Sequence, residues 1–233
     1  MRLDRYLSSV LPLTRSQARQ VIRQGRVAVN GETVREVALT VPQGTPVRFD
    51  GEVLTSPGYR YFMLNKPAGY VCATEDRQHS TVVDLLRQPK TDGLHVAGRL
   101  DIDVTGLVLV TDDGGWSHRI TSPRHKCPKT YLADLVEPLS ADGQHRLRVG
   151  ILLRGEERPT QPAKLELLSP QQVRLTLSEG RYHQVKRMFA AAGNRVVRLH
   201  RERIGGLSLD PELKAGDYRP LTPGEVEQVF LPD

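Results

Sequence analysis

Apolar residues at helical spacing predict two short helices at the start of the chain, the second over residues 14–25. Thr14 and Gln17 have the form of a capping box at the start of this second helix, and Gly25 stands where a helix ends. The apolar positions that define the two helices are Leu3, Leu7, Val10, Leu11, Ala18, Val21 and Ile22. This spacing predicts two amphipathic helices, each with one buried face.

After Gly25 the hydrophobic pattern changes to an alternation that is typical of β-strands. RVAVNGETV predicts a hairpin with Asn30-Gly31 as its turn, and further turns are expected at Gln43-Gly44 and Asp50-Gly51. Ser56-Pro57-Gly58 then reads as a linker. We therefore predict two domains, residues 1–57 and residues 58–233.

The larger domain is predicted to be rich in strands with helices inserted between them. One helix is expected in HQVKRMFAAAGN, where Val185, Met188, Phe189 and Ala192 have helical spacing. Strands are expected in YFMLNKP, GLVLVTDDG, KTYLADLV, VRLTLSEG and RVVRLHRERIG. Because there is no regular alternation of strand and helix, the fold class is α+β, with a mostly antiparallel or mixed sheet.

The 233 residues carry a net charge of +6, and the distribution of this charge is uneven. Residues 1–35 have a net charge of +5 and residues 181–203 a net charge of +6, so the remainder is acidic at −5. Of the 33 basic residues 26 are arginine, whose guanidinium group suits bidentate contact with phosphate. Clustered arginine favours a nucleic acid partner over an unevenly charged but inert surface.

Other broad classes of protein are disfavoured by the sequence. No apolar run is long enough to span a membrane, and the start of the chain does not resemble a signal peptide. Cys72 and Cys127 match no metal-binding spacing, which favours free thiols in a reducing, cytoplasmic compartment. No dinucleotide or P-loop fingerprint is present, and we expect neither a nucleotide cofactor nor a metal.

The segment GRLDIDVTGL holds the most conspicuous candidate chemistry, because it places two aspartates and an arginine between glycines. Asp101 and Asp103 could form a carboxylate pair of the kind that glycosidases use. With Asp112 they could instead hold magnesium for a nuclease. The plainest alternative is that Asp101 caps a turn and pairs with Arg99. Residue spacing alone leaves these alternatives open.

Residues 1 to about 55 resemble an S4 RNA-binding domain. The resemblance rests on RLDRYL, SQARQVIRQGRVAVNG and QGTPVRF, which together cover most of the segment. Arg15, Arg19 and Arg23 recur every fourth residue and form a stripe on the second helix. The resemblance implies that this stripe contacts RNA backbone. The residues predicted to bind RNA are Arg2, Arg15, Arg19, Arg23, Arg26 and Lys66.

The larger domain resembles the RsuA-type pseudouridine synthases, which act on bacterial 16S ribosomal RNA. GRLDIDVTGLVLVTDDG resembles the catalytic motif of this family. The other matching segments, in the family's order, are YFMLNKPAGYVC, WSHRITSPRHKCPKTYL, SEGRYHQVKRMFAAAGN and LHRERIGGL. The resemblance covers nearly the whole chain and implies that one uridine, at position 516 of 16S ribosomal RNA, is converted to pseudouridine without a cofactor.

The same resemblance implies roles for particular residues. Asp101, in the R-L-D triplet, matches the catalytic aspartate, and Arg99 matches the arginine associated with holding the everted nucleotide. Tyr131 matches a tyrosine that packs against the target base. Lys186 stands where many relatives have an arginine that pairs with the aspartate, and Val185 matches a neighbouring hydrophobic position. We expect Lys186 to keep Asp101 ionised in a site with little water.

An alternative of a different class is a non-catalytic S4-type RNA-binding protein that assists ribosome assembly. It would carry the same basic charge, and a change of Asp101 to asparagine would leave its effect intact. The substrate of an enzyme could be naked RNA or an assembling small-subunit particle. Nothing in the sequence indicates a dimer, so we expect a monomer.

Overall fold

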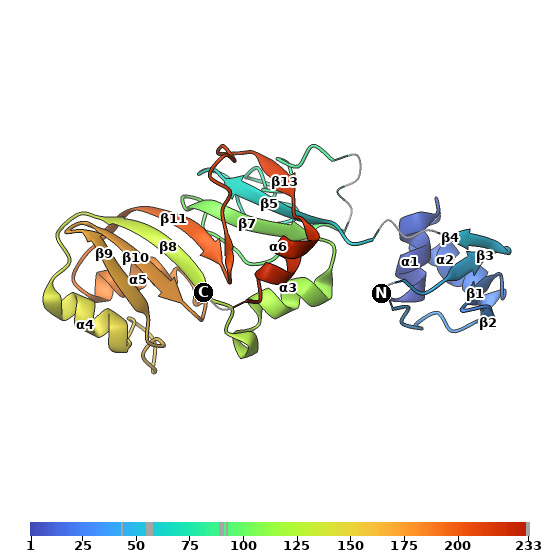
Figure 1. Ribbon diagram of the computed structural model, residues 1–233, viewed down its shortest axis with the longest axis horizontal. Coiled ribbons are helices and arrows are strands. Elements are labelled where there is room, and N and C mark those ends of the chain that lie inside the picture. The colour runs from blue at the N-terminus through green and yellow to red at the C-terminus, as the bar shows by residue number, and fades with distance from the viewer. Residues whose placement is uncertain (43, 55–57, 89–90, 92, 232–233) are drawn as a thin grey trace. The chain divides into compact units, whose positions relative to one another are not determined.

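A computed structural model describes residues 1–42, 44–54, 58–88, 91 and 93–231 (Figure 1). The chain divides into two compact units, Met1–Tyr59 and Arg60–Asp233. The linker predicted at Ser56-Pro57-Gly58 falls mostly outside the described residues, as does Gln43 of one predicted turn. The two units are described separately below.

The N-terminal unit consists of two helices and a four-stranded antiparallel sheet. Helix α1 spans Leu3–Val10 and helix α2 spans Arg15–Arg23, with the predicted capping box between Thr14 and Gln17. The strands, in the order β2-β1-β3-β4, are β1 (Val27–Val29), β2 (Glu32–Val34), β3 (Val47–Phe49) and β4 (Glu52–Leu54). The apolar faces of both helices pack against this sheet around Leu7, Ile22 and Val47.

Both described hairpins of this unit have the turns that the sequence predicts. Asn30 and Gly31 join β1 to β2 with φ angles of 52° and 87°, and Asp50 and Gly51 join β3 to β4 with 50° and 86°. Two successive positive φ angles match the right-handed twist of the paired strands, and asparagine, aspartate and glycine tolerate them best. The predicted hairpins and helices of this unit are therefore confirmed.

The C-terminal unit is built on one mixed sheet. Among the described residues its main path runs β13-β5-β7-β11-β8-β10-β9, with β6 paired to β7 and β12 to β11. The bounds are β5 (Tyr61–Lys66), β6 (His95–Val96), β7 (Thr105–Thr111), β8 (Lys129–Leu135), β9 (Lys164–Ser169), β10 (Gln172–Leu177), β11 (Val196–Ile204), β12 (Leu207–Ser208) and β13 (Tyr218–Pro220). The helices are α3 (Gly114–Thr121), η1 (Pro123–His125), α4 (Ala141–Val149), α5 (Gln184–Ala191) and α6 (Pro223–Gln228).

Strand β7 lies in the middle of this sheet and is buried on both faces. Val108 and Val110 belong to one hydrophobic cluster, whereas Leu107 and Leu109 belong to another on the opposite face. This placement explains why GLVLV is apolar without interruption instead of alternating. The first cluster packs α4 and α5 against the strands, and the second packs α3 and α6 (Figure 1).

The pairing of β7 with β11 is parallel, and the other pairs of the sheet are antiparallel. At the parallel junction Gly106 has a φ of +106°, and a Cβ atom there would lie 2.3 Å from the carbonyl oxygen of Arg201. Only glycine allows the two strands to approach this closely. The predicted α+β class with a mixed sheet is confirmed. Within the described residues, no helix is both long and apolar enough to cross a membrane.

Candidate active site

A cleft of about 860 Å³ in the C-terminal unit is lined by several segments that are far apart in sequence, and three of them carry the predicted site residues. The loop over residues 98–104 joins β6 to β7, Lys129 and Tyr131 come from the start of β8, and residues 177–186 join β10 to α5. The five residues predicted to act on the substrate all line this cleft: Arg99, Asp101, Tyr131, Val185 and Lys186. Tertiary folding therefore brings the predicted set together in one place.

Asp101 lies at the boundary between cleft and solvent, with 29% of its side chain exposed. Its Oδ1 atom is 3.5 Å from Nε2 of His183, and its Oδ2 atom is 3.5 Å from Nζ of Lys186. Both partners belong to the segment that starts α5 and not to the loop of Asp101 itself. The arrangement differs from the local turn-capping alternative, because Asp101 forms its ion pairs with a distant segment and not with Arg99.

Lys186 has a closer partner than the sequence indicated. Its Nζ atom donates hydrogen bonds to both carboxylate oxygens of Asp103, at 2.6 Å and 2.8 Å. These bonds lower the pKa of Asp103 below its ordinary value. The predicted pairing of Lys186 with Asp101 is present at the longer distance of 3.5 Å. Lys186 is thus shared between two carboxylates, and the exposed Asp103 holds it more tightly.

His183 is a cleft residue that the sequence interpretation missed. It occupies the N-cap of α5 with a φ of 48°, and its side chain makes no capping hydrogen bond. A left-handed conformation costs free energy for any residue other than glycine, and such strain is concentrated at functional sites. Its place three positions before Lys186, in HQVK, was the one available signal.

Buried groups fix the backbone of the loop that carries Asp101. Lys66 has no exposed surface, and its Nζ atom donates to the carbonyl oxygens of Pro67, Ile102 and Val104 at 2.7–3.1 Å. Gly69 also donates its N–H to Ile102 at 2.8 Å. The prediction that Lys66 binds RNA is therefore wrong: its ammonium group is enclosed by the protein and satisfied by backbone oxygens.

Arg201, which is 2% exposed, supports the same loop from β11. Its Nε atom donates to the carbonyl of Leu107 at 2.8 Å, and its Nη1 atom donates to the carbonyl of Arg99 at 3.2 Å. Residues 181–203 carry a net charge of +6, and the sequence does not show which of their basic side chains face RNA and which pair within the domain. Arg201 belongs to the second group, because its guanidinium bonds inside the protein to carbonyls at both ends of the segment that carries Asp101.

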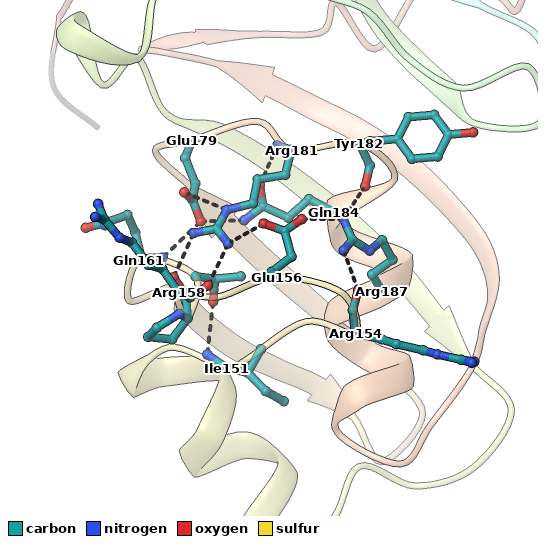
Figure 2. A network of polar contacts seen from close by, with 12 residues as sticks. Ile151, Arg154, Glu156, Arg158, Gln161, Glu179, Arg181, Tyr182, Gln184 and Arg187 are labelled. Atoms are coloured by element: carbon teal, nitrogen blue, oxygen red, sulfur yellow. Dashed lines mark hydrogen bonds and ion pairs between the residues drawn. The ribbon is translucent and has the colours of Figure 1, made fainter.

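Arg181 anchors the other wall of the cleft, and Figure 2 shows it at the centre of a polar network. It pairs with Glu156 at 3.1 Å and Glu179 at 3.3 Å, and it donates to the carbonyls of Arg158 and Pro159. Gln184 accepts from the N–H of Arg181 at 2.8 Å. These contacts connect the segment before α5 to the loop after α4. Arg181, like Arg201, is therefore a basic residue of segment 181–203 that bonds within the protein.

Tyr131 and Val185 are two of the less polar residues that line the cleft. Tyr131 is half-buried on β8, in register with Leu175 of β10 and Arg201 of β11. Val185, on the first turn of α5, is 5% exposed and packs in the main hydrophobic cluster. Arg99 is exposed. An aromatic ring and an aliphatic side chain near a carboxylate suit a flat, partly polar ligand such as a nucleobase.

The arginines of the N-terminal unit are partly used within that unit. Arg2, Arg15 and Arg19 converge on Asp4, whose side chain is fully buried, at 3.1–3.3 Å. Their own side chains remain 44–53% exposed. Burial acts to raise the pKa of Asp4, but the arginines outweigh it and hold the pKa at about 2. Three guanidinium groups around one carboxylate leave a net positive charge at the surface.

The remaining predicted RNA contacts of this unit are exposed, and their role stays a prediction. Arg26 pairs with Asp50, and Arg23 lies on the outer side of α2.

The nuclease alternative places Asp112 with Asp101 and Asp103, but Asp112 bonds Arg60 and does not line the cleft. In the described part of the chain, no three histidine, cysteine, aspartate or glutamate residues are grouped as metal ligands.

Comparison with known proteins gives matches to both units. Residues 1–47 match the S4 domain, and residues 60–191 match the family described as RNA pseudouridylate synthase. Two proteins named ribosomal small subunit pseudouridine synthase A are similar over the full length. The one from Yersinia pestis is 55% identical, covering 100% of this chain and 99% of the relative. The one from Escherichia coli K12 is 56% identical, covering 98% of this chain and all of the relative.

A solved structure titled as the crystal structure of a pseudouridylate synthase has the same fold. It is 52% identical, covers 98% of this chain and 99% of that chain, and superposes with a TM-score of 0.72. The match to the S4 domain, the match to the RNA pseudouridylate synthase family and the full-length relatives together define an RNA-modifying enzyme. The chain belongs to the RNA pseudouridylate synthase family, and the predicted resemblance to RsuA-type enzymes with an N-terminal S4 domain is confirmed.

Proposed function

We propose that this chain isomerises one uridine of 16S ribosomal RNA to pseudouridine, with Asp101 as the catalytic nucleophile or base. The observation that carries the proposal is the position of Asp101 in the cleft, beside two basic side chains and on a rigidly supported loop. The small-subunit relatives support ribosomal RNA as the substrate, and the target is the uridine that the family resemblance implies.

The reaction is balanced within the nucleotide. The bond between N1 of uracil and C1′ of ribose breaks, and a bond between C5 and C1′ forms. C5 loses a proton and N1 gains one, so no redox step and no group donor is needed. We therefore propose that the enzyme works without a cofactor, as a monomer in the cytoplasm. A carboxylate can serve in such a reaction as a covalent catalyst or as a proton acceptor.

The target uridine must leave the RNA stack before Asp101 can reach it. Eversion costs a few kcal/mol, and contacts in the pocket compensate for this cost. In our proposal Tyr131 stacks on the everted base, Val185 contacts its face or edge, and Arg99 holds the nucleotide. Lys186 stabilises the negative charge of Asp101. The arginines of the S4 domain contact phosphates, which position the enzyme without selecting a sequence.

The test compares two conservative changes in one loop. Asp101→Asn is expected to abolish isomerisation while RNA affinity stays within about two-fold. Asp103→Asn is the matched control, because it removes the other carboxylate that contacts Lys186. It is expected to retain turnover. Pseudouridine formation is measured by chemical mapping of 16S RNA under single-turnover conditions.

The outcomes separate the alternatives. Full turnover by Asp101→Asn would refute the role of Asp101 outright. Loss of turnover by Asp103→Asn alone would transfer the catalytic role to position 103. An unmodified 16S RNA in cells that make only the Asp101→Asn protein, with normal subunit assembly, would separate catalysis from an assembly role.

A further inference from the structure

Tyr182 is the most exposed aromatic side chain at the cleft, with 77% of its surface accessible. Large aromatic side chains are usually at least half-buried, because their exposure leaves apolar area in water. Within the described residues, Tyr182 is also the most exposed of the large hydrophobic side chains. It lies on the segment between Arg181 and His183, at the edge of the site proposed above.

The ring of Tyr182 stacks on the ring of His183. The two ring centroids are 3.8 Å apart with an interplanar angle of 22°. The imidazole ring of His183 in turn approaches Asp101, and its Nε2 atom is 3.5 Å from Oδ1 of that carboxylate. A continuous line of contacts therefore leads from the proposed catalytic carboxylate through an imidazole to a phenol ring at the surface. One face of that phenol ring is covered by His183.

The backbone under Tyr182 is held from both sides. Arg181 is fixed by the polar network described above, and Nη1 of Arg187 donates to the carbonyl oxygen of Tyr182 at 3.1 Å. Arg187 is itself paired with Glu156 at 2.9 Å. Figure 2 shows the Tyr182 ring extending away from this network. Little conformational freedom of the backbone remains to be lost when a ligand binds this ring.

We infer that Tyr182 is a stacking platform for an unpaired RNA base next to the everted uridine. The inference rests on the proposed function, because it assumes that the cleft receives a nucleotide of RNA. A base displaced from its stack when its neighbour is everted exposes a flat apolar surface, and aromatic rings are what RNA-binding proteins use to cover such a surface. The contact is with the ring face, so it is tolerant of base identity.

The experiment uses the 16S RNA substrate on which the full-length protein shows turnover. 2-Aminopurine replaces the nucleotide directly 5′ or directly 3′ of the target uridine, in two separate RNAs. Fluorescence and affinity are measured in the Asp101→Asn background, so that no product forms. Tyr182→Ala removes the ring, and Tyr182→Phe keeps it. Val149→Ala, at a 56% exposed position on α4, is the control for loss of an exposed apolar side chain.

We expect the Asp101→Asn protein, with or without Tyr182→Phe, to quench 2-aminopurine fluorescence at one of the two flanking positions. Tyr182→Ala should lose that quenching and bind RNA roughly ten-fold more weakly, in line with the loss of one base-stacking contact. Unchanged quenching in Tyr182→Ala at both positions would overturn the inference. So would an equal loss of affinity in Val149→Ala, or a loss in Tyr182→Phe as large as in Tyr182→Ala, which would indicate a hydroxyl contact.

Failure of the proposed function gives a different result. If Asp101→Asn still forms pseudouridine, the catalytic assignment fails while the effect of position 182 on quenching can still be read. If turnover depends on Asp101 but quenching does not depend on Tyr182, the inference alone fails. Circular dichroism of each variant confirms that the truncations, at exposed positions, leave the fold intact.

Discussion

The buried carboxylate of Asp4 predicts a pH-dependent stability of the N-terminal unit. A pKa lowered from 3.8 to about 2 corresponds to about 2.4 kcal/mol, at about 1.36 kcal/mol for each pH unit. The three arginines are about half exposed, so solvent screening reduces this value to about 1–2 kcal/mol. Asp4→Asn should therefore lower the free energy of unfolding of this unit by about that amount at pH 7.

The sign of the pH effect follows from the direction of the shift. Because the folded-state pKa of Asp4 lies below its unfolded value, the stabilisation is complete above about pH 5. It is lost as the pH falls through 3.8 towards 2. The difference in free energy of unfolding between the parent protein and Asp4→Asn should accordingly shrink over that range, because the Asp4 carboxylate becomes protonated first in the unfolded and then in the folded protein.

Hydrogen–deuterium exchange of the amides in α1 and α2, corrected for intrinsic rates, measures this stability within the full-length chain. Asp50→Asn is the matched control, because Asp50 forms a surface ion pair with Arg26, both about 45% exposed. Asp50→Asn should lower the free energy of unfolding of the N-terminal unit much less than Asp4→Asn does at pH 7. The reasoning would be refuted by equal losses in the two variants, or by a deficit in Asp4→Asn that persists undiminished near pH 2.

Three further changes test the C-terminal unit. Gly106→Ala should lower the melting temperature by several degrees or prevent folding, since a Cβ atom would clash with the backbone of Arg201 at a φ of +106°. Glu225→Gln should cost about 1–2 kcal/mol in urea unfolding at pH 7, with the deficit shrinking as the pH falls from 4.5 towards 2, because the bonds from Arg219 hold the pKa of Glu225 at about 2. Lys66→Met should reduce the single-turnover rate far more than RNA affinity, because two carbonyls of the Asp101 loop and that of Pro67 lose their donor; a loss of RNA affinity with an unchanged rate would count against this reasoning.

Resemblance to a known family identified more of the site than residue spacing did. From spacing alone, Asp101 and Asp103 were equivalent members of a pair. The cleft distinguishes them, because Asp101 is 29% exposed beside His183 whereas Asp103 is 65% exposed. The role of Asp103 as the closer partner of Lys186 was not visible, because the two residues are 83 positions apart in the sequence.

The sequence by itself determined the local elements of this protein. Periodicity, the capping box at Thr14 and the turn at Asn30-Gly31 act over a few residues, and their physical causes are contained in those residues. Only the tertiary structure decided which basic side chains face solvent. Lys66 and Arg201 look like surface cations in the sequence, yet both are enclosed under the Asp101 loop. Burial of a charge depends on acceptors that distant segments supply, and no local pattern contains that information.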